Sequence, residues 1–129
     1  MQTAPPDERE YVVSRLQNLG AGEAEAYARL LRATPVSRVI EGLSPWAFLP
    51  SPRELEPYCS EAAGRPLLPF AQAIGLDMVA CFTLPASGGT GVLVIDPWHE
   101  GSCQTLATLP GFAAWLSYAR DLAHRLAAG

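Results

Sequence analysis

Apolar residues in the first quarter of the chain recur at a spacing of three and four, which is typical of amphipathic helices. A first helix is predicted after Asp7, which with Glu10 has the spacing of a capping box, and it is expected to end at Gly20. A second helix is predicted over residues 23–32, before the helix-breaking Pro35. The inward positions of the two helices are predicted to be Val12, Val13, Leu16, Leu19, Ala24, Tyr27 and Leu31.

Prolines dominate the next part of the chain. Five prolines between residues 35 and 57 exclude long regular elements there. Residues 51–54, Ser-Pro-Arg-Glu, predict a helix start, with serine as the cap, proline at the first helical position and glutamate three residues after the cap. We expect this helix to bend or stop near Pro57 and to end by Gly64.

A strand-like pattern follows. The apolar segment 67–70 contains a proline and is predicted to be an edge strand, where the missing N–H donor is tolerated. Segments 77–84 and 91–96 predict two strands, and the glycine-rich segment 85–90 between them indicates an antiparallel hairpin. Residues 103–107 are expected to add a further short strand.

The chain closes with a predicted amphipathic helix that begins at Pro110. Because the strands are grouped rather than alternating with helices, we expect an α+β fold: an antiparallel meander preceded by N-terminal helices and closed by this C-terminal helix. One domain is predicted over 1–129, with a helical part at 1–34, a sheet at 66–109 and the closing helix at 110–127. The inward positions of the closing helix are predicted to be Phe112, Trp115, Leu116, Ala119, Leu122, Ala123 and Leu126, and the solvent-facing ones Arg120, Asp121, His124 and Arg125.

Composition and charge limit the classes of function that the chain is expected to have. The 129 residues are 49% hydrophobic and 17% charged, as expected of one compact domain. The net charge is −4, and an acidic chain without a basic stripe is not expected to bind nucleic acid. The longest apolar runs, of which Met78–Phe82 is one, are far shorter than the roughly twenty residues of a membrane-spanning helix, and no secretory signal is visible. We therefore expect a cytoplasmic protein that does not enter a membrane.

The three cysteines, Cys59, Cys81 and Cys103, are an odd number and form no Cys-x-x-Cys pair. This pattern argues against a disulfide framework and against a zinc knuckle. We expect free thiols in a reducing compartment, with Cys81 as a small core side chain in a strand. No metal and no cofactor are expected.

One loop gathers side chains that could carry chemistry. Asp96, His99, Glu100 and Cys103 are residue types that bind metals, and a small metal-dependent enzyme using them is the least favoured alternative. The segment lacks the second histidine of a His-Glu-x-x-His helix, so the ligand count falls short. No catalytic set is apparent elsewhere, and binding is favoured over catalysis.

The same loop supplies the candidate partner-binding residues. Trp98 lies between Asp96 and Glu100, and an exposed amphipathic aromatic of this kind often anchors a partner protein. The alternative, in which Trp98 folds back over the sheet, stays open at this point. Trp46 is a further candidate contact in the proline-rich segment.

Four segments of the second half resemble one protein family. They are Leu-Leu-Pro-Phe-Ala at 67–71, Gly-Leu-Asp-Met-Val-Ala-Cys-Phe at 75–82, Gly-Val-Leu-Val-Ile-Asp at 91–96 and Phe-Ala-Ala-Trp-Leu at 112–116. In order and character they resemble the SUKH superfamily, which includes fungal cell-wall-synthesis regulators and bacterial immunity proteins, and the chain looks like a divergent member.

The resemblance implies an α+β protein whose sheet forms a binding surface. Bacterial members hold a cognate toxin, commonly a nuclease or a deaminase, inactive in the producing cell. We therefore expect a non-enzymatic protein-binding domain whose partner is a polymorphic or contact-dependent toxin, and the acidic middle of the chain suits a basic partner. The alternative is a housekeeping adaptor or scaffold of the same fold that engages a cellular protein.

Overall fold

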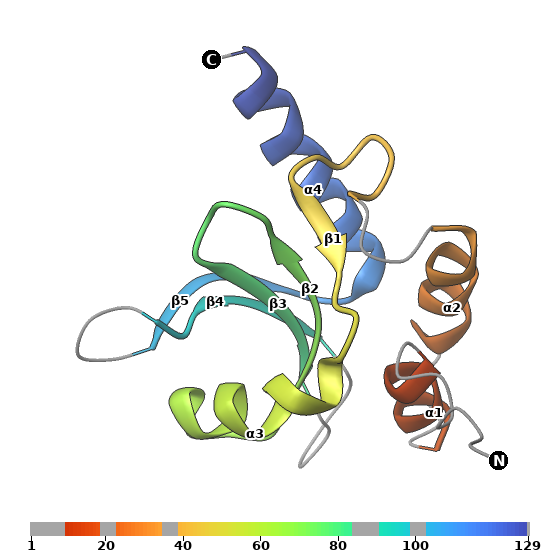
Figure 1. Ribbon diagram of the computed structural model, residues 1–129, viewed down its shortest axis with the longest axis vertical. Helices are drawn as coiled ribbons and strands as arrows, with labels where there is room; N and C mark the ends of the chain where they lie inside the picture. The colour runs from red at the N-terminus through yellow and green to blue at the C-terminus, as the bar shows by residue number, and fades with distance from the viewer. Residues whose placement is uncertain (1–9, 19–22, 35–38, 84–90, 99–102, 129) are drawn as a thin grey trace, which may run out of the picture.

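The computed structural model describes residues 10–18, 23–34, 39–83, 91–98 and 103–128, and Figure 1 shows it as a curved sheet with helices on both faces. The fold is α+β, as predicted. Among the described residues, no helix is long and apolar enough to cross a bilayer. The helices are α1 (Glu10–Asn18), α2 (Glu23–Ala33), α3 (Pro52–Ala63) and α4 (Phe112–Ala128), and the strands are β1 (Trp46–Phe48), β2 (Leu67–Ala73), β3 (Met78–Thr83), β4 (Val92–Asp96) and β5 (Gln104–Leu109).

The five strands form one antiparallel meander in the order β1-β2-β3-β4-β5. The hairpin predicted from the two apolar strands is confirmed, since Val79 pairs with Ile95 and Phe82 with Val92. The further strand is confirmed as well, although it runs to Leu109. The predicted turn at 85–90 lies outside the described residues.

The prediction that the proline-containing strand lies at the edge is wrong, because β2 lies between β1 and β3. The proline is accommodated because β1 is short. Its last residue, Phe48, pairs with Ala71, so Pro69 lies beyond the end of β1 and pairs only with Cys81 of β3. The missing N–H therefore falls where β2 has a neighbouring strand on one side only.

Alternation along the inner strands divides the core into two layers. Ala80, Phe82, Val92 and Val94 face a large cluster that contains the buried residues of α1, α2 and α4. Tyr27 lies at its centre, and its ring makes edge contacts with Phe48, Phe70, Phe82 and Phe112 at centroid distances of 5.4–5.6 Å. The alternate positions face α3 on the opposite side of the sheet, and the buried residues of this second layer are Cys59, Leu67, Val79, Cys81, Leu93 and Ile95.

The helices follow the predicted apolar spacing with two exceptions. First, α3 starts at Pro52 and ends at Gly64, whose φ of +73° suits glycine, but it continues through Pro57 instead of stopping there. Ser51 makes no side-chain capping bond, although it precedes the helix. Second, Leu126, predicted to face inward, is 49% exposed, since the end of α4 extends past the sheet (Figure 1).

Most of the remaining inward positions are confirmed where the structure describes the side chains; Leu116 and Leu122 are only partly buried against the core, and Ala123 is half-buried at the edge of a surface hollow. In the first two helices, the buried positions are Val12, Val13, Leu16, Tyr27 and Leu31. In α4, Phe112, Trp115 and Ala119 are buried, and Arg120, Asp121, His124 and Arg125 are exposed. Four predicted features lie outside the description, namely the Asp7 cap, Leu19, Gly20 and the Ala24 side chain.

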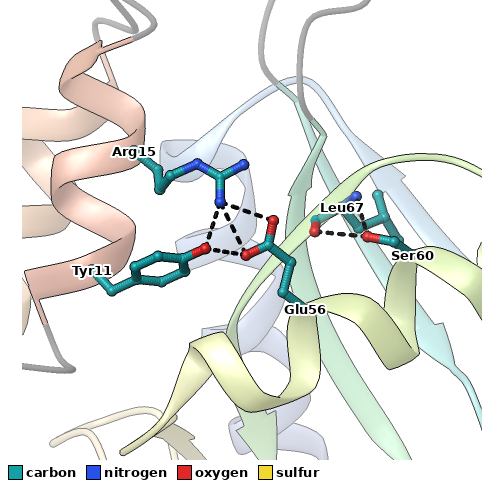
Figure 2. A network of polar contacts seen from close by, with 5 residues as sticks. All are labelled: Tyr11, Arg15, Glu56, Ser60 and Leu67. Carbon is teal, nitrogen blue, oxygen red and sulfur yellow. Dashed lines mark hydrogen bonds and ion pairs between the residues drawn. The ribbon is translucent and has the colours of Figure 1, made fainter.

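A polar network joins α1 to α3 (Figure 2). The Tyr11 hydroxyl donates a hydrogen bond to Glu56, and Arg15 Nη1 donates to both Glu56 carboxylate oxygens at 2.9 and 3.0 Å. Ser60 of the same helix bonds to both the N–H and the C=O of Leu67, at 3.0 and 3.1 Å, and so fixes α3 to β2. These contacts hold α3 in place against the sheet.

Candidate functional site

An exposed aromatic pair lies where α3 meets the end of β4. The ring of Tyr58, from α3, stacks on the indole of Trp98 with centroids 6.3 Å apart and an angle of 30° between the planes. The two side chains remain 42% and 46% exposed. Stacked rings with this much open surface offer apolar area to a partner. Because the two side chains are already held in place, binding does not have to pay the entropic cost of ordering them.

Hydrogen bonds hold the pair in position from both sides. The Tyr58 hydroxyl donates to the carbonyl oxygen of Pro97 at 3.3 Å. The backbone N–H of Trp98 donates to Asp96 Oδ1 at 3.0 Å, a local turn that directs the chain away from β4. The position of Trp98 is therefore set by the strand before it and by the helix beside it.

Acidic side chains flank the pair. Leu55 and Cys59 point into the second core layer, which turns Tyr58 outward. Glu54 and Glu61, four residues before and three after Tyr58, lie on the same side of the helix, and both are exposed. We call the set Glu54, Tyr58, Glu61, Asp96 and Trp98 the aromatic–acidic surface.

The structure brings together two of the residues that the sequence singled out. Trp98 and Asp96 are adjacent and hydrogen-bonded, and Trp98 packs against a helix rather than folding back under cover. Glu100 lies outside the described residues. Sequence reasoning missed Tyr58, whose outward position follows from the spacing of Leu55 and Cys59 once the helix is known to continue past Pro57.

Trp46 does not belong to this surface, which corrects its assignment as a contact residue. It is fully buried in β1, and its ring meets Trp115 edge-on with centroids 5.4 Å apart. The reason is that residues 46–48 pair with β2 and so enter the large core cluster. A side chain in this position has no surface to offer a partner.

The three thiols converge on the α3 face of the sheet, although they are far apart in sequence. Cys59 and Cys81 are fully buried, Cys103 is partly buried beside them, and all three are free. The hydrogen bond between Cys59 and Cys81 lowers the pKa of the Cys59 thiol. The same bond, together with burial, raises the pKa of the Cys81 thiol well above its ordinary value. Burial, followed by the charges of Cys59 and Asp96, raises the pKa of Cys103. A raised pKa disfavours the nucleophilic thiolate at neutral pH.

The loop that would hold a metal under the least favoured alternative lies only partly within the described residues. His99 and Glu100 lie outside the described residues, and within the described part of the chain no group of three or more histidine, cysteine, aspartate or glutamate side chains is arranged to hold a metal ion.

A hollow of about 330 Å³ between α4 and the segment before β1 gathers residue types used in hydrolysis. Ser44, Glu41 and His124 all line it, and all three are exposed. Neither a hydrogen bond nor an ion pair joins any two of these described side chains, so the serine has no base in contact with it. This hollow therefore lacks the nucleophile–base contact that activates a serine.

Comparison of the chain with family models, with curated proteins and with solved structures finds no match. Function is therefore inferred from the geometry of the surface and from the sequence resemblance to the SUKH superfamily.

Proposed function

We propose that the chain is a non-enzymatic protein-binding domain that engages its partner through the aromatic–acidic surface. The observation that carries the proposal is the Tyr58–Trp98 stack, in which two large aromatics are held in place and left over 40% exposed. Such aromatics supply most of the binding energy in many interfaces, since they bury a large area at small entropic cost.

The charge around the pair indicates the kind of partner. Glu54, Glu61 and Asp96 give this side of the molecule an acidic character, in agreement with a net charge of −4. A basic protein would be steered toward it, and an arginine or lysine could stack on the open face of Trp98.

In line with the SUKH resemblance, we propose that the partner is a bacterial toxin and that the chain is its immunity protein. It would bind the toxin in the cytoplasm of the producing cell and occlude the toxin's active surface. The three free thiols agree with a reducing compartment. A housekeeping adaptor would use the same surface on a cellular protein, and a neighbouring reading frame for a secreted toxin distinguishes the two.

The experiment is growth protection. Cells that express the toxin encoded beside this chain receive the wild-type protein, the double variant Tyr58→Ala/Trp98→Ala, or Ile74→Ala. Ile74 is an equally exposed apolar residue (51%) in the turn between β2 and β3, so it is the matched control. We expect the wild type and Ile74→Ala to protect and the double variant to fail while retaining its circular dichroism spectrum. Protection by the double variant would contradict the assigned surface.

A further inference from the structure

The contact between α1 and α3 shows which groups this fold places against a partly exposed aromatic ring. The guanidinium of Arg53 lies over the ring of Tyr11 at 4.8 Å from its centroid, and that of Arg15 lies over it at 5.5 Å. The carboxylate of Glu56 pairs with Arg15 at 2.9 Å beside the same ring (Figure 2). An aromatic face, a guanidinium and a carboxylate therefore meet on this side of α3, and the cation is stabilised by both of its neighbours.

The aromatic–acidic surface repeats two of these three groups on another side of the same helix. Glu56 and Tyr58 are two residues apart, so they point to different sides of α3. Tyr58 and Trp98 supply aromatic faces, and Glu54 and Glu61 supply carboxylates about one helical turn from Tyr58. Within the described part of the chain, neither of these two glutamates forms an ion pair and no guanidinium lies over either ring.

We propose that the aromatic–acidic surface receives an arginine side chain of the partner protein, with the guanidinium stacked on the open face of Trp98 and paired with Glu61. This inference rests on the proposed function, because it names the group of the partner that the surface binds. Charge complementarity selects a cation, since the net charge of the chain is −4 and the surface contains three carboxylates and no basic side chain.

The geometry favours arginine over lysine and over a quaternary ammonium group. A guanidinium is planar and weakly hydrated, so it can lie flat on an indole ring while its N–H groups reach a carboxylate beside the ring. The ammonium of lysine is a strongly hydrated point charge, and it gains less from a ring that stays partly open to water. A quaternary ammonium group is bound by a cage of aromatic rings, whereas Tyr58 and Trp98 pack on each other with 30° between their planes.

Fluorescence polarisation with two labelled peptides, hexaarginine and hexalysine, tests this inference on the full chain at one ionic strength. General attraction to an acidic protein acts on both peptides alike, so the ratio of their affinities isolates the contribution of the guanidinium. The wild type is expected to bind hexaarginine at least about fivefold more tightly than hexalysine. Trp98→Ala should bring this ratio to about one and leave the affinity for hexalysine nearly unchanged.

Further variants serve as controls, and circular dichroism of each confirms that it is folded. Trp98→Phe keeps a ring with a weaker cation–π interaction and should give an intermediate ratio, so the test stays valid if Trp98→Ala disturbs the loop. Ile74→Ala, at a comparably exposed residue, should keep the wild-type ratio. Glu61→Gln should weaken the binding of hexaarginine at least about threefold. Asp121→Asn, which removes the same charge from an exposed side chain on α4, should leave that binding nearly unchanged.

Three results would overturn the inference: equal affinities of the wild type for the two peptides, no binding of either peptide, and an arginine preference that survives Trp98→Ala. The test needs no toxin, so its failure is separate from that of the proposed function. Growth protection that depends on Tyr58 and Trp98 without an arginine preference would reject arginine alone. An arginine preference without growth protection would reject the immunity function and retain this site.

Discussion

Tyr58 and Trp98 come from separate segments of the chain, yet their rings stack at 6.3 Å and each helps to hold the other at the surface. The contact explains how two large aromatics stay exposed and ordered together. Each ring covers one face of its neighbour, and the hydrogen bond from Tyr58 to Pro97 holds the tyrosine over the loop. A partner meets a prepared apolar area rather than two mobile side chains.

The first prediction uses tryptophan fluorescence. Trp46 and Trp115 are fully buried, whereas Trp98 is 46% exposed. Acrylamide should therefore quench one component of the emission strongly and the remainder weakly, and Trp98→Phe should remove the strongly quenched component. If the variant kept that component, one of the other two indoles would have to be accessible, contrary to the structure.

The second prediction concerns the network between α1 and α3. Glu56→Gln removes the negative charge that forms an ion pair with Arg15 at 2.9 Å. The side chain of Glu56 is only 18% exposed. We expect a loss of about 1 to 2 kcal/mol in the free energy of unfolding, measured by urea titration. Glu25→Gln is the control, because the Glu25–Arg29 pair is almost fully exposed and its loss should leave stability unchanged. Equal effects of the two substitutions would contradict this account.

The third prediction concerns alkaline pH. Burial, followed by the hydrogen bond and charge of Glu56, raises the pKa of Tyr11 above its usual value near 10. The folded state therefore holds the Tyr11 proton more tightly than the unfolded state does. The resulting contribution of Tyr11 to the free energy of unfolding is fully present below pH 10 and is lost as the pH rises through the pKa of the folded state.

Tyr11→Phe should accordingly make the unfolding free energy fall less steeply above pH 10 than it does in the wild type. At pH 7 the variant should be less stable by about 1 kcal/mol, because the bond to Glu56 is gone. Tyr118, whose pKa is also raised by burial, remains in the variant and accounts for a residual slope. An unchanged slope would show that Tyr11 is not the titrating group.

The fourth prediction concerns thiol accessibility. Cys59 and Cys81 are fully buried and Cys103 only partly, so Ellman's reagent should react with one thiol in the native protein and with all three after unfolding. The raised pKa of Cys103 makes the native reaction slow at neutral pH and faster as the pH increases. Cys103→Ser should abolish the native reaction; if a native reaction persisted, α3 would have to open more readily than its packing indicates.

The hairpin of β3 and β4 and the closing helix α4 could be predicted from the sequence, because their apolar periodicity is strong and local. The path of α3 through Pro57 could not, since the contacts of Leu55 and Cys59 with the sheet favour continuation over the local effect of proline. The central position of β2 depends on the length of β1, which the proline-rich segment does not reveal.

Only part of the candidate surface could be predicted from the sequence. Trp98 and Asp96 stand out because they are neighbours in the sequence. Tyr58 comes from a helix forty residues earlier, and only the tertiary fold brings it to Trp98. Trp46 and Trp98 both follow a proline directly, yet one pairs into the sheet core and the other leaves the end of a strand. Their local sequence does not distinguish these outcomes.

The affinity of the isolated toxin partner for the wild type, Trp98→Ala and Ile74→Ala, measured by calorimetric titration, tests the central claim most directly. We expect Trp98→Ala to raise the dissociation constant about 30-fold. This change corresponds to a loss of about 2 kcal/mol of binding free energy, as is typical of a central aromatic anchor. Ile74→Ala should bind like the wild type. An unchanged affinity for Trp98→Ala would contradict the claim that the molecule works through this exposed aromatic pair.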